Sequence, residues 1–510
     1  MSRMSQSKIS DLFKGDVKGP YVVANYLVVS KHLDLERIAL QVASSVSVGL
    51  NTNADFIIPY FERLKTVCPR YKTQPIPLPG DPRNVGFVNL VIPLDSFVSD
   101  GNVDITQLLN VLLGNFFEEK EVTSIKLMDL EFSESSLDSF DGPTLGIDGL
   151  REITGTKKTQ RPHIAVVPQP PLGLDAGKYA ELCYVLAKAG ADHIVDSDIL
   201  MNPKHCSILD RAYHVTKALE RLKKEESRTV LYSLNITSNQ DKILEVAEKA
   251  FKAAGGSSNL TFAVSPVITG LSCLQSLCKF TKNHRIPIHV HITGLPLLAR
   301  NRTFGLSYAA FNIMIRLLGA DMAHGGSLTG RYLLVLEENP ELLQTRFSEM
   351  TYAPTILSKE FVDRAQANAV AESIKEARNN NNVLTQKTLH GATKEIRRTF
   401  QLVVGGINPC NIEYHVRLLG KDIILLGGTS LFRDRADSKY SSVVSAVKAM
   451  RQAISLVMQG ISVGEARALG KQDEYKELFC YLDQHGDEFN RWDWRRQPDE
   501  IKSMDRLHSP

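Results

Sequence analysis

The segment Gly190–Asp198 carries three carboxylates around a short apolar run and ends in Val195-Asp196-Ser197-Asp198. Carboxylates just after a buried strand are typical of sites for Mg²⁺, which prefers a near-octahedral shell of oxygen ligands. Val195 within this run offers a cation no oxygen, so the segment looks like a metal-binding strand end with too few ligands, and the sequence predicts no metal and no cofactor.

Two histidines and two glycine-rich turns are the other candidates for chemistry. His291 and His324 each end an apolar run, and each is either a hydrogen-bonded strand-end residue or a group that polarises a substrate. Gly405-Gly406 with Asn408-Pro409, and Gly427-Gly428-Thr429, are typical of an anion site in which backbone N–H groups face the ligand. The alternative for these glycines is a tight strand-to-helix connection. A carboxylate or a single phosphate would fit such a site better than a bisphosphate.

Apolar strand-like runs alternate with segments of helical period from Pro162 onward, which predicts a parallel sheet with helices outside it. Eight strands are expected, and eight such units predict an α/β fold of the (β/α)8 TIM barrel type. The expected strands are His163–Pro168, His193–Asp198, Val230–Thr237, Leu260–Pro266, Ile286–Ile292, Ala320–Gly325, Phe400–Gly406 and Asp422–Gly428. Helices are expected at Asp241–Ala254, Leu306–Leu318 and Ser438–Gln459.

A smaller α+β domain is expected before the barrel. Its predicted elements are strands at Tyr21–Ser30, Gly86–Pro93 and Ser124–Glu131 and helices at Asp34–Ala43 and Ile105–Leu113. The predicted division is a disordered amino terminus at 1–20, the α+β domain at 21–142, the barrel with carboxy-terminal helices at 143–486, and a polar tail at 487–510. An excursion at about 337–398 is far longer than a usual connection and is expected to add helices, and the tail's Trp492 and Trp494 are expected to dock on the protein.

Composition favours a protein that works on small metabolites. The 510 residues carry a formal net charge of +3 with both signs interspersed, which argues against nucleic acid or an anionic membrane as a partner. The first twenty residues lack a secretion signal, and no later stretch approaches the run of about 18 apolar residues that spans a membrane. The seven cysteines form no CxxC pair and are expected to be reduced core residues. These features predict a cytoplasmic protein.

The segment Gly142–Arg151 resembles the barrel entry of the ribulose-bisphosphate carboxylase large-subunit family. Other segments resemble that family's sequence in the same order, namely Gly114–Phe117, Pro171–Leu174, Ile288–His291, Gly319–His324, Gly405–Pro409 and Ala449–Ala453. The resemblance runs from about Tyr21 to Gly486 and is that of a divergent RuBisCO-like protein, similar to form IV. It implies a ferredoxin-like amino-terminal domain and a homodimer in which this domain closes the partner's barrel mouth, so that the active site is shared.

Most catalytic groups of that family have no counterpart here. The family's carbamylated lysine and two acidic magnesium ligands correspond to Val195, Ser197 and Asp198. Gln169 and Pro171 replace the lysine pair after the first strand, which removes the base that would abstract a substrate proton. Because carbamylation requires a lysine, the resemblance implies that this chain is not a ribulose-bisphosphate carboxylase.

Apolar residues stand where the family has polar groups facing the substrate. They are Val195, Ile292, Leu295, Val404 and Leu426. They predict either a pocket for an apolar ligand or a mouth filled in as core, and the pocket is favoured because concave barrel mouths normally bind something. The candidate catalytic residues are His291, His324, Arg331 on the closing loop and Asn115 from the partner subunit. The candidate substrate-binding residues are Gln169, Val195, Asp198, Ile292, Leu295, Val404, Gly405, Gly406, Gly428 and Thr429.

Three functions stay open at this point. The favoured one is a metal-independent isomerase or cyclase, acting on a largely apolar metabolite with one anionic or carbonyl end, such as a pericyclic ring closure in secondary metabolism. The second is a non-catalytic binding or regulatory pseudoenzyme. The third is an enolase or isomerase of a methylthio-sugar phosphate, which the missing lysines and metal ligands oppose.

Overall fold

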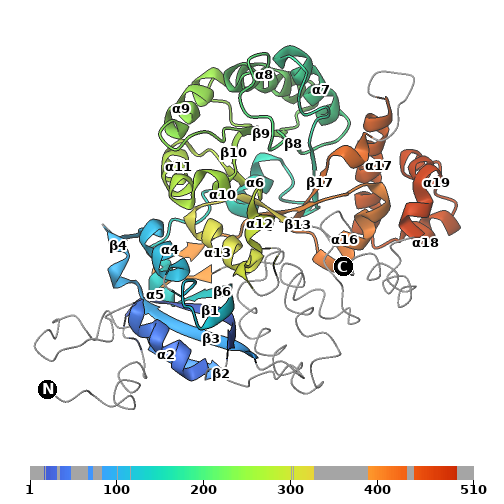
Figure 1. The fold of residues 1–510 in the computed structure, drawn as a ribbon. Coiled ribbons are helices and arrows are strands. Elements are labelled where there is room, and N and C mark those ends of the chain that lie inside the picture. The colour runs from blue at the N-terminus through green and yellow to red at the C-terminus, as the bar shows by residue number, and fades with distance from the viewer. Residues whose placement is uncertain are drawn as a thin grey trace, which may run out of the picture.

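In the computed structural model, an α+β unit lies beside a closed barrel, and helices near the carboxyl terminus lie on the barrel's other side (Figure 1). The structure describes residues 17, 19–31, 35–46, 67–72, 83–99, 101–114, 116–299, 301, 304–326, 389–432 and 441–490. In these residues, no helix combines the length and the apolar character needed to cross a membrane.

The amino-terminal part is a five-stranded sheet of order β12-β6-β1-β3-β2. Its strands are β1 (Tyr21–Lys31), β2 (Val67–Lys72), β3 (Arg83–Pro93), β6 (Val122–Phe132) and β12 (Gly305–Leu306), accompanied by helices α2 (Leu35–Ser45), α4 (Ile105–Leu113) and α5 (Glu134–Leu137). β1 pairs antiparallel with both β3 and β6. Every element predicted here from the sequence is present, whereas β2 and the short pair β4 (Val98–Ser99) and β5 (Asn102–Val103) were not predicted.

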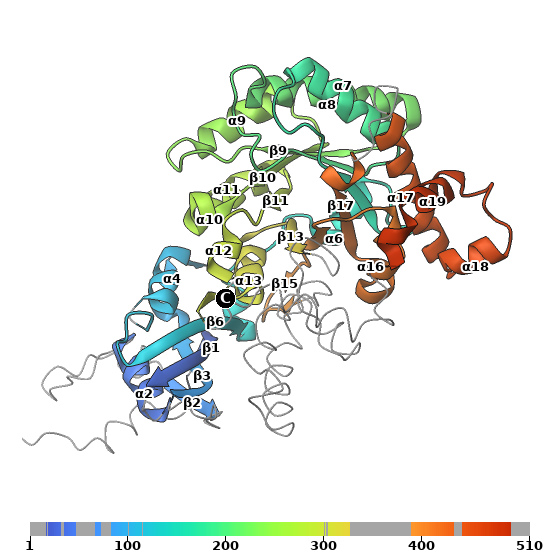
Figure 2. The ribbon, with the colours of Figure 1, turned by 45° about the vertical axis from the view of Figure 1, so that its right-hand side comes forward.

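Eight parallel strands form the barrel in the order β10-β11-β13-β16-β17-β7-β8-β9, which confirms the predicted (β/α)8 architecture. The strands are β7 (His163–Val166), β8 (His193–Val195), β9 (Leu231–Asn235), β10 (Leu260–Val264), β11 (Ile288–Val290), β13 (Met322–Gly326), β16 (Phe400–Val404) and β17 (Ile423–Gly427). The helices are α7 (Ala176–Lys188), α8 (Ile208–Glu226), α9 (Ile243–Ala253), α10 (Pro266–Thr269), α11 (Leu271–His284), α12 (Leu295–Ala299), α13 (Tyr308–Leu318), α16 (Ile412–Leu419) and α17 (Ser441–Met458). The longer helices surround the strands, as both ribbon views show (Figures 1 and 2).

Helix α6 (Gly146–Ile153) packs at the amino-terminal end of the barrel. The carboxylate of Asp321, just before β13, accepts hydrogen bonds from the backbone N–H groups of Leu145 (2.6 Å) and Gly146 (2.8 Å). Arg151 of α6 lies over the ring of Phe400, the first residue of β16, at 5.0 Å from its centroid. This end is therefore closed, and the carboxyl ends of the strands are left for a functional site.

The connection between β13 and β16 lies mostly outside the described residues, as do both tryptophans of the tail, so the helices predicted for the excursion and the docking of the tail stay predictions. The last part of the β13–β16 connection forms a hairpin of β14 (Leu389–His390) and β15 (Glu395–Ile396). Two further helices, α18 (Val463–Ala468) and α19 (Lys476–Asn490), follow α17, and α19 packs against it (Figure 2).

Candidate functional site

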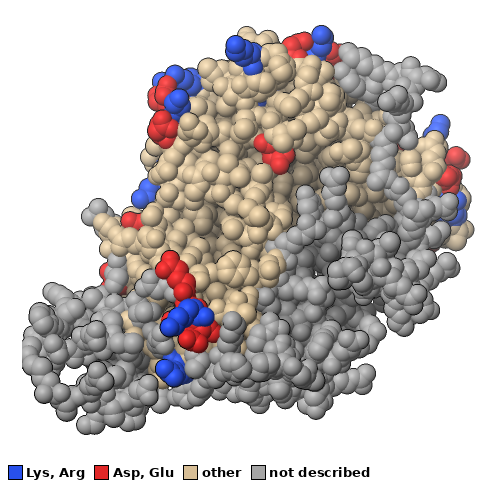
Figure 3. Space-filling view, viewed as in Figure 1, with Lys and Arg blue, Asp and Glu red and all other residues tan. Residues whose placement is uncertain are grey.

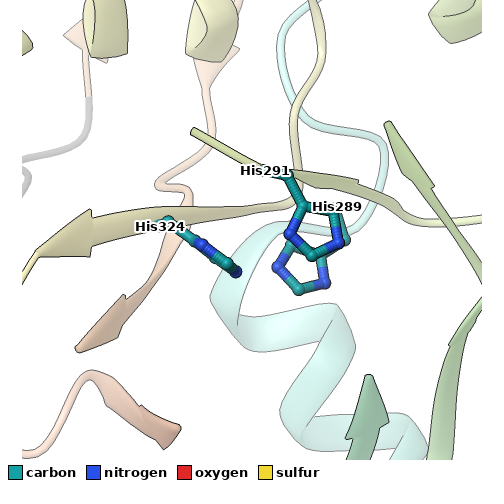
Figure 4. Close-up of side chains that lie close together, drawn as sticks. All are labelled: His289, His291 and His324. Carbon is teal, nitrogen blue, oxygen red and sulfur yellow. The ribbon is translucent and has the colours of Figure 1, made fainter. Parts of the chain in front are cut away.

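Three histidines meet inside the carboxyl-terminal half of the barrel (Figure 4). His289 is in β11, and His291 follows directly after it. Because alternate residues of a strand point to the same face, the two rings stack, with centroids 5.0 Å apart and planes at 21°. His324 comes from the neighbouring strand β13, and its ring lies 5.0 Å from that of His289 and 4.7 Å from that of His291. We call these three residues the histidine triad.

The triad is buried and uncharged at neutral pH. The exposed fractions of His289, His291 and His324 are 0%, 3% and 9%. Burial lowers the pKa of His291 to about 4. Burial and the neighbouring imidazoles hold the pKa of His289 and of His324 well below the usual 6.5. Each ring is therefore a neutral imidazole with one N–H donor and one nitrogen lone pair.

Several ring nitrogens of the triad have no hydrogen-bond partner among the described residues. They are Nδ1 and Nε2 of His289, Nε2 of His291 and Nε2 of His324. His291 and His324 were predicted from the sequence as site residues, and His289 was not. The His-x-His spacing was the available signal, since it places both imidazoles on one face of a strand.

The end of β8 has the apolar character that the sequence predicted. Val195 is the last residue of the strand and is buried. Asp196 turns away from the mouth, because its Oδ2 lies 3.0 Å from Nε of Arg211 in α8. Asp198 is exposed, and the hydroxyl of Thr293, just beyond β11, donates to its Oδ2 at 2.9 Å. One carboxylate, that of Asp198, thus remains at the rim of this strand end.

The five apolar replacements are all part of the buried core, each with an exposed fraction of 8% or less: Val195, Ile292, Leu295, Val404 and Leu426. Val195 and Leu295 have at most 1% of their surface exposed, whereas Ile292, Val404 and Leu426 have 6–8% exposed. Gln169, after β7, is half-buried. The mouth therefore has an apolar floor that includes small exposed areas.

The glycine-rich turns differ in what they offer to an anion. Gly405 and Gly406 have φ of +104° and +81°, which favour glycine. The helix amino terminus expected after Asn408-Pro409 is a three-residue turn, and its Cys410 N–H already donates to Oδ1 of Asn408 at 2.9 Å. After β17, Gly428 is half-buried and Thr429 is exposed. The anion site stays a prediction that now rests on the glycines and Thr429.

Asn115 and Arg331 lie outside the described residues, so their predicted roles stay predictions.

Large apolar side chains are exposed in the segments after four of the barrel strands. They are Leu172 after β7, Ile199 and Met201 after β8, Ile268 after β10, and Leu297, Leu298 and Phe304 after β11. Leu297 has an exposed fraction of 86%, and the ring of Phe304 packs edge-on against Phe117 of the amino-terminal part at 5.8 Å. Charged side chains are sparse over the described part of the barrel on the face seen in Figure 3. We call these seven residues the apolar rim.

Comparison with known proteins gives a consistent result. The family model for the ribulose bisphosphate carboxylase large chain, catalytic domain, matches residues 146–478. The ribulose bisphosphate carboxylase of Thermococcus kodakarensis is 28% identical over 455 residues, which cover 86% of this chain and 90% of that protein. An octameric carboxylase structure from Pyrococcus horikoshii OT3 has a TM-score of 0.74 at 22% identity and covers 94% of this chain and 97% of that chain. A rubisco-like protein from Burkholderia fungorum has a TM-score of 0.67 at 22% identity and covers 91% and 99%.

Proposed function

The chain belongs to the ribulose bisphosphate carboxylase large-chain family, and on that premise we propose that it is a non-carboxylating member that isomerises or cyclises a small, largely apolar molecule in the barrel mouth. Carbamylation needs an amine, and the position at the end of β8 is the buried Val195. Asp196 is held by Arg211, so only Asp198 offers a carboxylate there. A magnesium centre of the carboxylase kind has too few ligands at this strand end.

The observation that carries the proposal is the histidine triad beside the apolar floor. Polar atoms buried without a partner cost free energy, so a ligand that supplies partners would be held there. A neutral imidazole N–H can donate to a carbonyl oxygen and stabilise the negative charge that develops on it. Ile292 follows His291 in the chain, and Val404 lies in β16, the strand next to β13. Both side chains suit contact with the apolar part of the same ligand.

A pericyclic ring closure or rearrangement fits this arrangement because such a reaction neither adds nor removes atoms and needs no strong base. The floor would hold the reactive conformer, and His291 or His324 would polarise the carbonyl. A carboxylate on the substrate would find backbone N–H groups at Gly406 and Gly428. The methylthio-sugar phosphate reaction has less support, since it depends on the lysine and metal ligands that are absent here.

We also propose that the apolar rim is covered by a second subunit. Large apolar side chains exposed at one end of a barrel typically mark an interface. The solved relative from Pyrococcus horikoshii is octameric. A homodimer in which the partner's amino-terminal domain, with Asn115, lies over the mouth would bury the rim and complete the site. None of the six cysteines whose side chains are described forms a disulfide, which suits a reducing compartment such as the cytoplasm.

The test is to release and identify small molecules bound to the full-length protein by mass spectrometry. Two variants reduce the space at the mouth, Val195→Trp and Leu426→Phe. Leu469→Ser, at an exposed site after α18, is the matched control. We expect one apolar acid or ketone from wild type and control, and at least about tenfold less from the mouth variants, whose folding is checked by circular dichroism.

A second candidate, the non-catalytic pseudoenzyme, is favoured by the deep burial of Val195 and Leu295. If folded wild-type protein releases nothing, or if all variants release the same molecule equally, the mouth is filled in and this second candidate replaces the first.

A further inference from the structure

The unpartnered nitrogens of the histidine triad need an explanation even when no substrate is bound. Buried polar groups in native proteins are nearly always satisfied, and leaving one unsatisfied costs roughly 1–3 kcal/mol. The triad holds four such atoms among the described residues, on His289, His291 and His324. All three side chains converge on one another in the barrel interior (Figure 4). A partner that accepts one lone pair from each imidazole would satisfy three of these four nitrogens together.

We propose that the histidine triad binds one divalent transition-metal ion, with Zn²⁺ as the best match, and leaves a fourth coordination position open. One ligand nitrogen from each imidazole lies within 4.8 Å of the others. A tetrahedral zinc site with Zn–N bonds of about 2.0–2.1 Å places its nitrogens roughly 3.4 Å apart. Small rotations of the three side chains would bring the nitrogens to that spacing.

The origin of the ligands supports this site. His289 lies in β11 and His291 directly after it, both rings face the same side, and His324 projects from the adjacent strand β13. The barrel sheet thus fixes all three ligands on rigid elements, which suits a precise metal geometry. Three protein ligands with an open fourth position are the usual form of a catalytic zinc centre, and three histidines are one such ligand set.

The chemistry of the ligands selects the ion. Imidazole nitrogens suit zinc, cobalt, nickel and copper, whereas Mg²⁺ requires oxygen ligands. The site would therefore be distinct in position and in ligand type from a carbamate–carboxylate magnesium centre.

Binding of the ion does not depend on the proposed function, although its catalytic use does. The bound ion would accept a substrate carbonyl oxygen at its open coordination position and polarise it as a Lewis acid, in place of an imidazole N–H. The metal independence expected from the sequence would then apply to magnesium alone.

The test is a titration of full-length protein, free of any affinity tag and stripped with a chelator, with Co²⁺ as a spectroscopic substitute for Zn²⁺. We expect one Co²⁺ per chain with the intense visible absorption of tetrahedral cobalt, and displacement by one equivalent of Zn²⁺. His289→Gln and His324→Gln should each weaken binding by at least about 100-fold, since they remove a direct ligand. His284→Gln, at an exposed histidine of α11, is the control and should bind as wild type does.

A second variant separates loss of a ligand from loss of the fold. His324→Cys replaces one ligand by another, so it should retain Co²⁺ and add a thiolate-to-cobalt charge-transfer band, which no structural role of His324 would produce. The inference is overturned if folded wild-type protein binds no Co²⁺ at one equivalent, or if the triad variants bind it as tightly as the control. If the protein binds the metal but releases no small molecule, the metal site is supported and the proposed function is refuted. If it releases a small molecule but binds no metal, the proposed function is supported and the metal site is refuted.

Discussion

The ion pair between Arg211 and Asp196 anchors the segment that follows β8. Both side chains are fully buried, and Nε of Arg211 lies 3.0 Å from Oδ2 of Asp196. The other carboxylate oxygen accepts hydrogen bonds from the hydroxyls of Tyr179 (2.8 Å) and Tyr232 (2.9 Å). Burial alone would lower the pKa of Arg211, but the adjacent carboxylate outweighs burial and raises it. The guanidinium also holds the loop, since it donates to the carbonyl of Met201 at 2.6 Å.

Replacing Arg211 by Met should destabilise the protein by about 3–5 kcal/mol, because it leaves the Asp196 carboxylate buried without its counter-charge. Replacing Asp196 by Asn in the same protein removes that charge. Both Arg211→Met and the double variant lose the guanidinium's hydrogen bonds to the loop carbonyls, and the double variant also loses a carboxylate acceptor of the Asn235 N–H, at about 1–3 kcal/mol, which is less than the cost of the uncompensated charge. We therefore expect the double variant to be more stable than Arg211→Met.

Urea unfolding followed by circular dichroism measures this difference. Wild type, both single variants and the double variant form a cycle from which the coupling free energy is obtained. The reasoning fails if Arg211→Met unfolds within 1 kcal/mol of wild type, or if the double variant loses the sum of the two single losses. Either result would mean that the buried pair is not the anchor of the segment that carries Asp198.

Two further predictions concern pH and backbone geometry. Burial lowers the pKa of His193 and His291 to about 4, so below pH 6.5 the unfolded chain binds more protons than the native protein. The free energy of unfolding should therefore fall as the pH falls from 6.5 to 4, by up to about 1.4 kcal/mol per pH unit for each histidine. A urea midpoint that does not change across this pH range would contradict the prediction. Gly305→Ala should destabilise by at least about 1 kcal/mol, because φ is +103° and an added Cβ would lie 2.1 Å from the carbonyl oxygen of Leu298; a thermal midpoint equal to that of wild type would refute this.

The barrel was predictable because each of its strands is a short apolar run bounded by turns or helices. Parallel strands buried on both faces give such continuous runs. β12 was not predictable, because two residues carry no periodic signal and their pairing with β6 depends on contacts about 180 residues away in the chain. Local pattern therefore predicts the barrel but misses the strand that joins it to the amino-terminal sheet.

The site was predictable only in part, for similar reasons. His291 and His324 were visible as residues at the ends of strands, and the apolar character of Val195 was certain from its identity. The sequence places Asp196 at the end of a strand but does not show to which side its carboxylate points. In the structure that carboxylate pairs with Arg211 in the next helix. The convergence of His289 with His324 depends on the neighbouring position of β11 and β13, which only the closed sheet provides.

The pairing of β12 with β6 has a consequence for synthesis on the ribosome. Gly305 and Leu306 lie beside Lys126 and Leu127, and the buried Lys126 ammonium donates to the carbonyls of Ala299 and Asn301 at 2.7 and 2.6 Å. The amino-terminal sheet therefore lacks its last strand until about 170 further residues have been translated, which takes roughly 10 to 35 s at 5–20 residues per second. During that time one edge of β6 is unpaired, and a nascent chain is open to pairing with other strands until the barrel segment emerges.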